Sequence, residues 1–248
     1  MKGITFICCY NNTKQLNKML LKSIEKIPSG NTNLFLIDSK EQNFKSAAEA
    51  YNRTLRDKWE EIGDIIIFLH QDIAFDNIDF INHIKEEFTN KPLQIIGFAG
   101  ITDKGIVYSN LKYYNTKEYI TRNQLTEDKI EVGSIDECCF ATTKQVLKEI
   151  GFDEKCCSHW HLYAVDLCYN AKRKNIVSFI IPDVIYHKED GRDGLYTDYH
   201  FLKTMWKMVL KYRNDFTTIY APCYICTTNP FKAFVRLART AIKNYFKQ

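Results

Sequence analysis

A run of five apolar residues, Ile65–Leu69, passes directly into the polar triplet His70-Gln71-Asp72. A short apolar run with polar residues on both sides predicts a strand that is buried on both faces, as in a mostly parallel sheet. In such sheets ligands bind outside the carboxyl ends of the strands. Asp72 therefore follows a predicted strand at the place where a metal-bound or phosphorylated ligand would bind.

The segments before this strand alternate between strand and helix patterns. Ile4–Tyr10 and Leu34–Ile37 are short apolar runs that predict two further strands, the second ending at Asp38. Thr13 and Ser46 can cap the helices that follow them. This β-α-β-α-β alternation predicts an α/β fold with a mostly parallel sheet flanked by helices.

The pattern continues less regularly after the first hundred residues. Polar and tyrosine-rich segments between residues 100 and 129 predict loops and a short hairpin. Further helices are predicted at Asp79–Phe88, Thr143–Ile150, Leu162–Lys174 and Phe201–Tyr212, and further strands at Leu93–Phe98, Ile176–Ile181 and Val184–Tyr186.

Composition limits the classes of function. The 248 residues are 45% hydrophobic and carry a net charge of +4, which is too small to indicate a nucleic-acid partner. No run approaches the roughly 18 apolar residues that span a bilayer, and Ile4–Tyr10 is too short for a secretory signal. The nine cysteines include the adjacent pairs Cys8-Cys9, Cys138-Cys139 and Cys156-Cys157. We therefore expect reduced thiols and a cytoplasmic protein.

The last residues, Pro230–Gln248, predict an amphipathic helix. Its apolar side chains fall on one face and its basic side chains on the other, and no acidic residue follows Asp215. Such a helix is typical of a peripheral element on an anionic membrane surface. The alternative is a terminal helix that docks on its own domain and leaves a basic face in solvent.

A nucleotide at the predicted sheet edge would need its pyrophosphate neutralised. The glycine-rich turn that usually does this is missing, since no glycine lies between Gly3 and Gly30. A divalent cation held by Asp72 is the economical substitute, because hard cations bridge carboxylates and phosphates. The alternative for Asp72 is that it only caps the following helix or loop. The alternative for Asp38 is that it only stabilises the turn in which it lies.

Several segments together resemble a known family. ITFICCYNN, FLID, AAEAYNRTL and IIIFLHQDI, in this order, are similar to family 2 type GT-A glycosyltransferases, and more narrowly to a bacterial group with HQD in place of Asp-x-Asp. The later segments VGSIDECCFATTKQVLKEIGFDE, WHLYAVDLCYNAKRKN and VIYHKEDG extend the resemblance to about residues 3–200. It implies a GT-A (Rossmann-like) domain over residues 1–228, with a nucleotide-binding half (1–100) and an acceptor-side half (101–228), followed by a basic amphipathic tail (229–248).

The resemblance also implies roles for individual residues. It implies that Asp72 and His187 bind Mn²⁺ or Mg²⁺ and that Asp166 is the general base. The alternative for His187 is a purely structural role. The alternative for Asp166 is a carboxylate that stabilises the helix dipole at the start of its helix. Implied nucleotide-binding residues are Tyr10, Asn11, Asp38, Asn52 and His70, with a metal-ligand role left open for His70; implied substrate-binding residues are Asp136 and His161. Trp160 is either a core residue or a platform on which a sugar stacks. The glycine hinges of Gly191–Gly194 indicate a lid whose Arg192 would bind the substrate diphosphate.

The implied activity is the transfer of a sugar from a nucleotide-sugar, with UDP as the expected nucleotide, to a glycan or a lipid-linked acceptor. A base on the face opposite the leaving group implies inversion at the anomeric carbon. The alternatives are a sugar-1-phosphate nucleotidyltransferase and a non-catalytic nucleotide- or sugar-binding module. The tail makes the inner membrane surface a candidate partner, and a homo-oligomer stays open.

Overall fold

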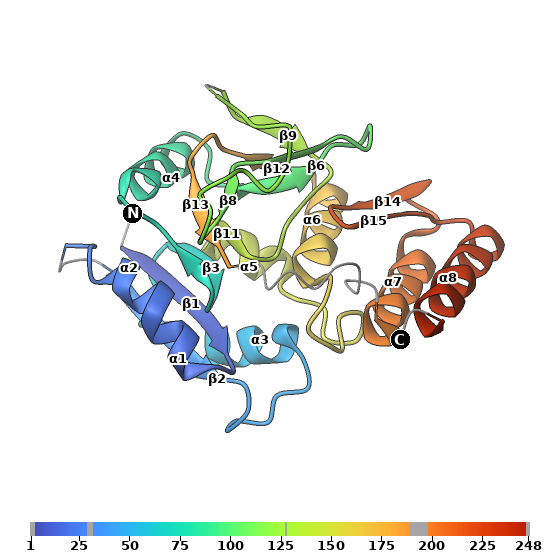
Figure 1. Ribbon diagram of the computed structural model, residues 1–248, viewed down its shortest axis with the longest axis horizontal. Helices are drawn as coiled ribbons and strands as arrows, with labels where there is room; N and C mark the ends of the chain where they lie inside the picture. Colours follow the sequence, from blue (N-terminus) through green and yellow to red (C-terminus); the bar gives the residue numbers. More distant parts are fainter. Residues whose placement is uncertain (1–2, 29–31, 127, 189–197, 247–248) are drawn as a thin grey trace.

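The computed structural model describes residues 3–28, 32–126, 128–188 and 198–246. Its central sheet has seven strands in the order β2-β1-β3-β11-β5-β12-β9 (Figure 1). Five of them run parallel, while β11 and β9 run antiparallel to their neighbours. The predicted mostly parallel α/β sheet is therefore confirmed. The strands are β1 (Ile4–Tyr10), β2 (Thr32–Asp38), β3 (Ile65–His70), β5 (Gln94–Gly97), β9 (Ile130–Val132), β11 (Cys139–Thr143) and β12 (Val177–Ile180).

Helices cover both faces of this sheet, and β3 is an interior strand between β1 and β11. The five apolar residues of β3 are at most 1% exposed. Ile66 and Phe68 join the core under α3 (Ala47–Asp57), α5 (Lys144–Ile150) and α6 (Tyr163–Arg173). Ile65, Ile67 and Leu69 join the core on the opposite face, with α4 (Asp79–Asn90) and the first helical segment. β3 is therefore buried on both faces, as predicted. This burial explains why polar and apolar residues do not alternate along the strand.

The first helical segment differs from its prediction at its start. It comprises α1 (Thr13–Leu16), a π-helical turn η1 (Asn17–Leu21) and α2 (Lys22–Ile24). Its cap is Asn12 and not Thr13, because Asn12 has the extended backbone of a cap and its side chain accepts the Gln15 N–H at 3.1 Å. The cap predicted for α3 is confirmed, since Ser46 Oγ accepts the Glu49 N–H at 3.1 Å.

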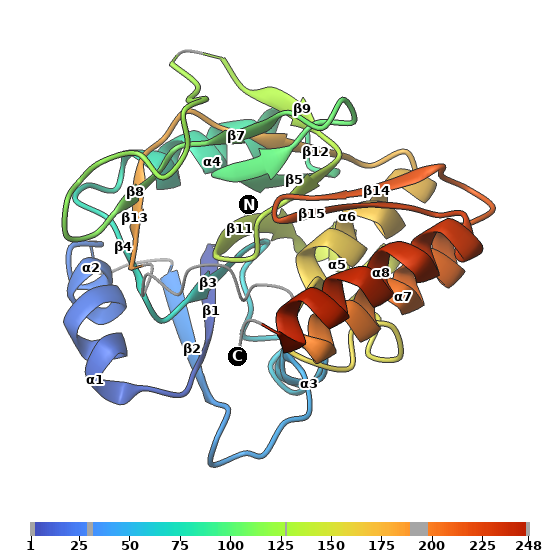
Figure 2. The same ribbon diagram turned by 45° about the vertical axis from the view of Figure 1, so that its right-hand side comes forward.

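Several strands were not predicted, among them β11 and the hairpin near the end of the chain. The buried strand β11 lies between β3 and β5 and runs against both of them. A hairpin, β14 (Thr218–Ala221) and β15 (Tyr224–Thr227), forms in a segment that the sequence pattern left without structure. It packs against α8 (Pro230–Tyr245), which lies beside α7 (Tyr199–Tyr212) at one end of the molecule (Figures 1 and 2).

Short strands outside the central sheet close the edge at which the parallel strands end. β4 (Ile73–Ala74), β13 (Ile185–His187) and β8 (Leu111–Tyr113) form one small sheet, in which His187 pairs with Ile73. This register brings His187 beside Asp72 across more than a hundred residues of sequence. A second small sheet contains β6 (Ala99–Ile101), β7 (Val107–Ser109) and β10 (Ser134–Ile135).

Among the described residues, no helix is both long enough and apolar enough to cross a bilayer.

Candidate active site

The carboxyl ends of β1, β2 and β3 meet at one edge of the sheet. Tyr10 pairs with Asp38, and Cys9 pairs with His70. A cavity of about 400 Å³ opens at this edge. It is lined by Cys9, Tyr10, Asn11, Ser39, Lys40, Ala47, Tyr51, His70, Gln71, Asp72, Trp160 and Tyr163.

A second cavity, of about 370 Å³, lies on the other side of His70. His70 and Trp160 line both cavities, so the two spaces adjoin. The second cavity draws its other lining residues from the chain after residue 100. They include Asp136, Glu137, Cys138, His161, Leu162, Val165, His187, Phe201, Pro222 and Cys223.

Three potential metal ligands gather where the cavities meet. One ligand atom each of His70, Asp72 and His187 lies within 4.8 Å of the others, and His187 Nε2 is 3.5 Å from Asp72 Oδ2. Burial alone would raise the pKa of Asp72, but the His187 and His70 imidazoles outweigh it and lower this pKa. Asp72 Oδ1 is buried and has no hydrogen-bond partner among the described residues. An unsatisfied carboxylate oxygen between two imidazoles fits a divalent cation.

His70 has a defined orientation. Its Nε2 lies 3.0 Å from the hydroxyl of Tyr163, at the start of α6. Burial lowers the pKa of His70, which favours the neutral imidazole that a metal requires. The residue before Tyr163, Leu162, has φ +65° and no side-chain cap, so the turn that presents Tyr163 is held in the left-handed region. The resemblance implied that His70 binds the nucleotide, and a metal-ligand role stayed open; His70 lines the first cavity and also belongs to this cluster.

Gln71, the middle residue of the triplet, ties two strand ends together. Its Oε1 accepts the backbone N–H groups of Asn11 and Asn12 at 3.0 and 2.9 Å. Its Nε2 donates to Asn11 Oδ1 at 2.9 Å. The loop after β1 is therefore held against the end of β3 by three hydrogen bonds from one side chain. The sequence analysis gave Gln71 no role, because its partners lie about sixty residues away.

Two adjacent carboxylates lie on the floor of the second cavity. Asp136 Oδ1 accepts the Cys138 N–H at 3.0 Å. Burial, with Asp136 adding to it, raises the pKa of Glu137 well above its usual value. Backbone N–H groups at the start of α6 face the Glu137 carboxyl, yet its Oε1 has no partner among the described residues. This unsatisfied oxygen suits a ligand hydroxyl. The sequence analysis missed Glu137 although it directly follows Asp136.

His161 is positioned by an acidic partner. Its Nε2 lies 3.4 Å from Asp198 Oδ2, at the start of α7. Trp160, which precedes it, is 37% exposed and lines both cavities, so the structure excludes a core position for this side chain. An imidazole held by a carboxylate beside a cavity is a constellation that can take up a proton.

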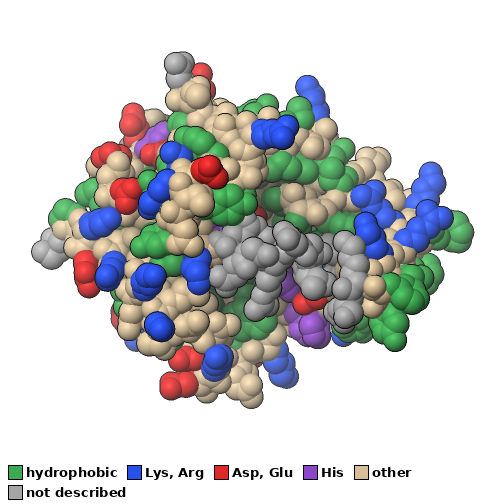
Figure 3. Space-filling view, in the orientation of Figure 1, with side chains coloured by type: hydrophobic (Ala, Val, Ile, Leu, Met, Phe, Trp, Pro, Cys, Tyr) green, Lys and Arg blue, Asp and Glu red, His purple; other side chains and the backbone are tan. Residues whose placement is uncertain are grey.

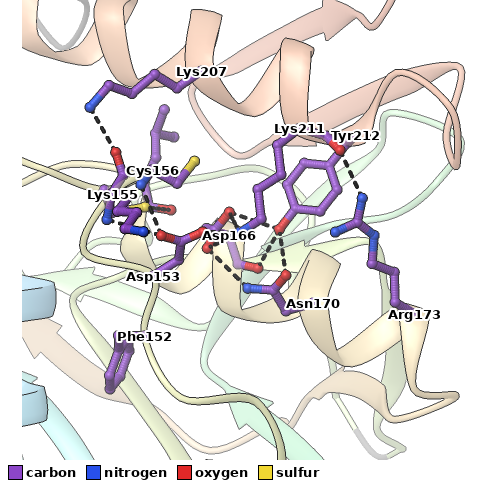
Figure 4. A network of polar contacts seen from close by, with 12 residues as sticks. Phe152, Asp153, Lys155, Cys156, Asp166, Asn170, Arg173, Lys207, Lys211 and Tyr212 are labelled. Carbon is purple, nitrogen blue, oxygen red and sulfur yellow. Dashed lines mark hydrogen bonds and ion pairs between the residues drawn. The ribbon is translucent and has the colours of Figure 1, made fainter.

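The structure contradicts the expected role of Asp166. This residue is 1% exposed and lines neither cavity. Lys211 Nζ donates to its two oxygens at 2.8 and 2.9 Å, and the Tyr212 hydroxyl donates to Oδ1 at 2.7 Å (Figure 4). Burial raises the pKa of Asp166, with Lys211 opposing the rise. Asp166 therefore joins α6 to α7 and cannot reach an acceptor.

Other expected nucleotide-binding residues also have local roles. Asn52 lines neither cavity; its side chain bonds to the backbone of Phe152, and it too is displaced from its expected role. Asp38 does not line the first cavity, although Ser39 and Lys40 do, and its Oδ1 accepts the N–H groups of Lys40 and Glu41. Arg192 and the predicted lid Gly191–Gly194 lie outside the described residues.

The fold and the site can now be compared with known proteins. GalNAc-T7 is similar over 84% of this chain and 48% of its own, with a TM-score of 0.58 and 8% identity. TarS from S. aureus, as residues 1–349, is similar over 87% of this chain and 68% of its own, with a TM-score of 0.57 and 14% identity. The chain thus spans about half the length of GalNAc-T7. At these identities the likeness shows the fold alone, and no match was found among curated protein sequences.

The fold is that of the GT-A glycosyltransferases, as the sequence resemblance implied. The sequence profile of the glycosyltransferase like family matches residues 5–188, which is most of the chain, and the protein belongs to this family. The family that the sequence resemblance implied, a glycosyltransferase-like family, is thereby confirmed.

Proposed function

We propose that this protein transfers a sugar from a nucleotide-sugar, with UDP as the nucleotide, to a glycan or a lipid-linked acceptor. The observation that carries the proposal is the cluster of His70, Asp72 and His187 between two adjoining cavities. Two relatives in fold support the choice of donor. TarS was crystallised with UDP-GlcNAc, and GalNAc-T7 with UDP, GalNAc and Mn²⁺.

The two cavities suit the two ends of such a donor. The first lies at the carboxyl ends of parallel strands, where nucleotides bind in α/β folds, and Tyr10 and Asn11 line it. The second offers Trp160, whose flat face suits a sugar ring, and the carboxylates Asp136 and Glu137. Most lining residues of the first cavity precede residue 100 and most of the second follow it, which supports the proposed halves 1–100 and 101–228.

The donor set favours Mn²⁺ over Mg²⁺. Asp72 and His187 would hold the ion together with His70, and two imidazoles with one carboxylate suit a first-row transition metal better than Mg²⁺, which prefers oxygen ligands. When bound, the ion would bind the diphosphate and stabilise the negative charge of the departing nucleotide.

Because Asp166 is buried and lines neither cavity, we assign the role of general base to His161. It lines the second cavity, and Asp198 orients its imidazole. His161 takes the proton of the acceptor hydroxyl as that oxygen attacks the anomeric carbon, and the bond to the nucleotide diphosphate breaks. Asp136 and Glu137 accept hydrogen bonds from sugar hydroxyls and so orient the ring. Attack from the side opposite the leaving group gives inversion.

A nucleotide-sugar panel tests this proposal. We expect free UDP to be released from one or more UDP-sugars in the presence of Mn²⁺, and EDTA to abolish the release. Asp72→Asn should raise the Mn²⁺ concentration needed for half-maximal turnover at least tenfold, whereas Asp76→Asn, an exposed carboxylate on the loop after β4, should leave it unchanged. Release of pyrophosphate would indicate a nucleotidyltransferase, and binding of UDP-sugars without turnover across an acceptor panel would indicate a binding module. Either result would overturn the proposal.

A further inference from the structure

Helix α8 packs on the protein through a narrow face. Ala233 and Leu237 are its buried residues, and they point toward α7 and β15. Tyr224 of β15 adds a hydrogen bond to Thr240, with 2.9 Å between the two hydroxyl oxygens. The apolar stripe that sequence periodicity identified, Phe231, Phe234, Ala238, Ile242 and Phe246, is a different face of the helix.

That apolar stripe lies in solvent instead. Phe231 is 77% exposed, Phe234 61%, Ile242 57%, Tyr245 76% and Phe246 81%. Phe234 also contacts Trp206 of α7, with 6.1 Å between the ring centroids. Large aromatic and aliphatic side chains therefore line the full length of the helix without cover from the described residues. Contiguous exposed apolar surface of this kind marks an interaction site.

A row of cations runs beside the apolar stripe. Lys232, Arg236, Arg239 and Lys243 are exposed and line a shallow groove of about 410 Å³. Ion pairs with the described acidic residues are absent from this row, and the chain has no acidic residue after Asp215. Figure 3 shows basic and apolar side chains next to one another at the end of the molecule where α8 lies.

From these two adjacent rows we infer that α8 binds lengthwise on an anionic lipid surface. The apolar row enters the boundary between headgroups and acyl chains, and the cationic row contacts the phosphates of the headgroups. A single plane can satisfy both rows at once, because both run along the whole helix. Because the cationic row is positively charged, it favours an anionic lipid surface over a neutral one. The inference goes beyond sugar transfer and does not depend on it, although a lipid-linked acceptor would be met at the same surface.

Vesicle binding tests the inference on the full chain. We expect co-sedimentation with vesicles of phosphatidylglycerol and phosphatidylcholine, weak binding to phosphatidylcholine alone, and release as NaCl rises from 0.05 to 0.5 M. Arg236→Gln/Arg239→Gln should weaken binding about 30-fold, since each cation near such a surface contributes about 1 kcal/mol. Phe231→Ser/Phe234→Ser should weaken it at least as much.

Matched controls use exposed residues away from α8. Lys85→Gln/Lys148→Gln removes two cations, and Ile106→Ser removes an exposed apolar side chain; neither should change vesicle binding. Circular dichroism verifies that each variant is folded. Equal binding to neutral and anionic vesicles, or no binding by the folded protein, would overturn the inference. So would a dimer, seen by sedimentation without lipid, that Phe231→Ser/Phe234→Ser dissociates, because α8 would then be covered by a second copy.

Discussion

At the scale of single residues, Asp72 and Asp166 show how the surroundings decide what a carboxylate can do. Both belong to motifs that resemble those of glycosyltransferases. Asp72 keeps a buried oxygen without a partner, beside two imidazoles. Asp166 has both oxygens engaged by Lys211, Tyr212 and Asn170 (Figure 4). Only the first is free to bind a ligand. Sequence alone could not separate them, because Lys211 and Tyr212 lie about 45 residues beyond Asp166.

Asp166→Asn should therefore act on stability and not on chemistry. The substitution leaves the Lys211 ammonium buried beside a neutral amide, with Asp153 at 2.8 Å as its remaining acidic partner. We expect the free energy of unfolding to fall by about 3 kcal/mol, measured by urea denaturation, and the turnover of the folded enzyme to stay within about twofold. Asp57→Asn, at an exposed position of α3, is the control. A hundredfold loss of turnover with unchanged stability would restore Asp166 as the base.

His161→Gly should remove the proposed base and leave a space for a substitute. Loss of general base catalysis is expected to lower turnover about 10²- to 10⁴-fold, and free imidazole in the assay should restore part of it. His159→Gly is the matched control, because His159 lies two residues away, pairs with His200 and lines neither cavity. Imidazole should not affect that variant. Full activity of His161→Gly would contradict the assignment.

At the scale of elements, the strands that form the site were predicted well and their connections were not. β1 has the predicted bounds, and β3 extends one residue beyond its predicted end at Leu69, to His70. The antiparallel strand β11 was missed, because its sequence CFATT ends in two threonines and so lacks the continuous apolar run that identified β3. The partners of Gln71 were missed for a related reason. Side-chain contacts between a strand end and a distant loop leave no pattern in the sequence.

Gln71→Ala should loosen the loop after β1. The backbone amides of Asn11 and Asn12 lose their acceptor, so hydrogen exchange of a peptide covering residues 10–13 should become faster. Because these bonds are solvent-exposed, we expect the unfolding midpoint to change little. Gln42→Ala, an exposed glutamine with no such bonds, should leave the exchange of that peptide unchanged. Unchanged exchange in Gln71→Ala would show that the loop is held by other contacts.

At the scale of the whole molecule, two cavities adjoin at the centre and a helix with an uncovered apolar stripe lies at one end. The predicted amphipathic helix is confirmed as α8, but the face by which it docks was not predictable. Periodicity identifies an apolar stripe; it does not tell whether α7 or another surface will cover that stripe. The helix packs on the protein through the buried residues Ala233 and Leu237 instead.

The sequence by itself determined the alternation of strands and helices, the burial of Ile65–Leu69 and the presence of polar residues at three strand ends. These are local properties, and parallel strands necessarily bring their carboxyl ends to one edge. The tertiary structure alone decided the direction of β11, the burial of Asp166 and the exposure of the α8 stripe. Each of these depends on contacts between segments far apart in the chain, and a periodic pattern holds no information about such partners.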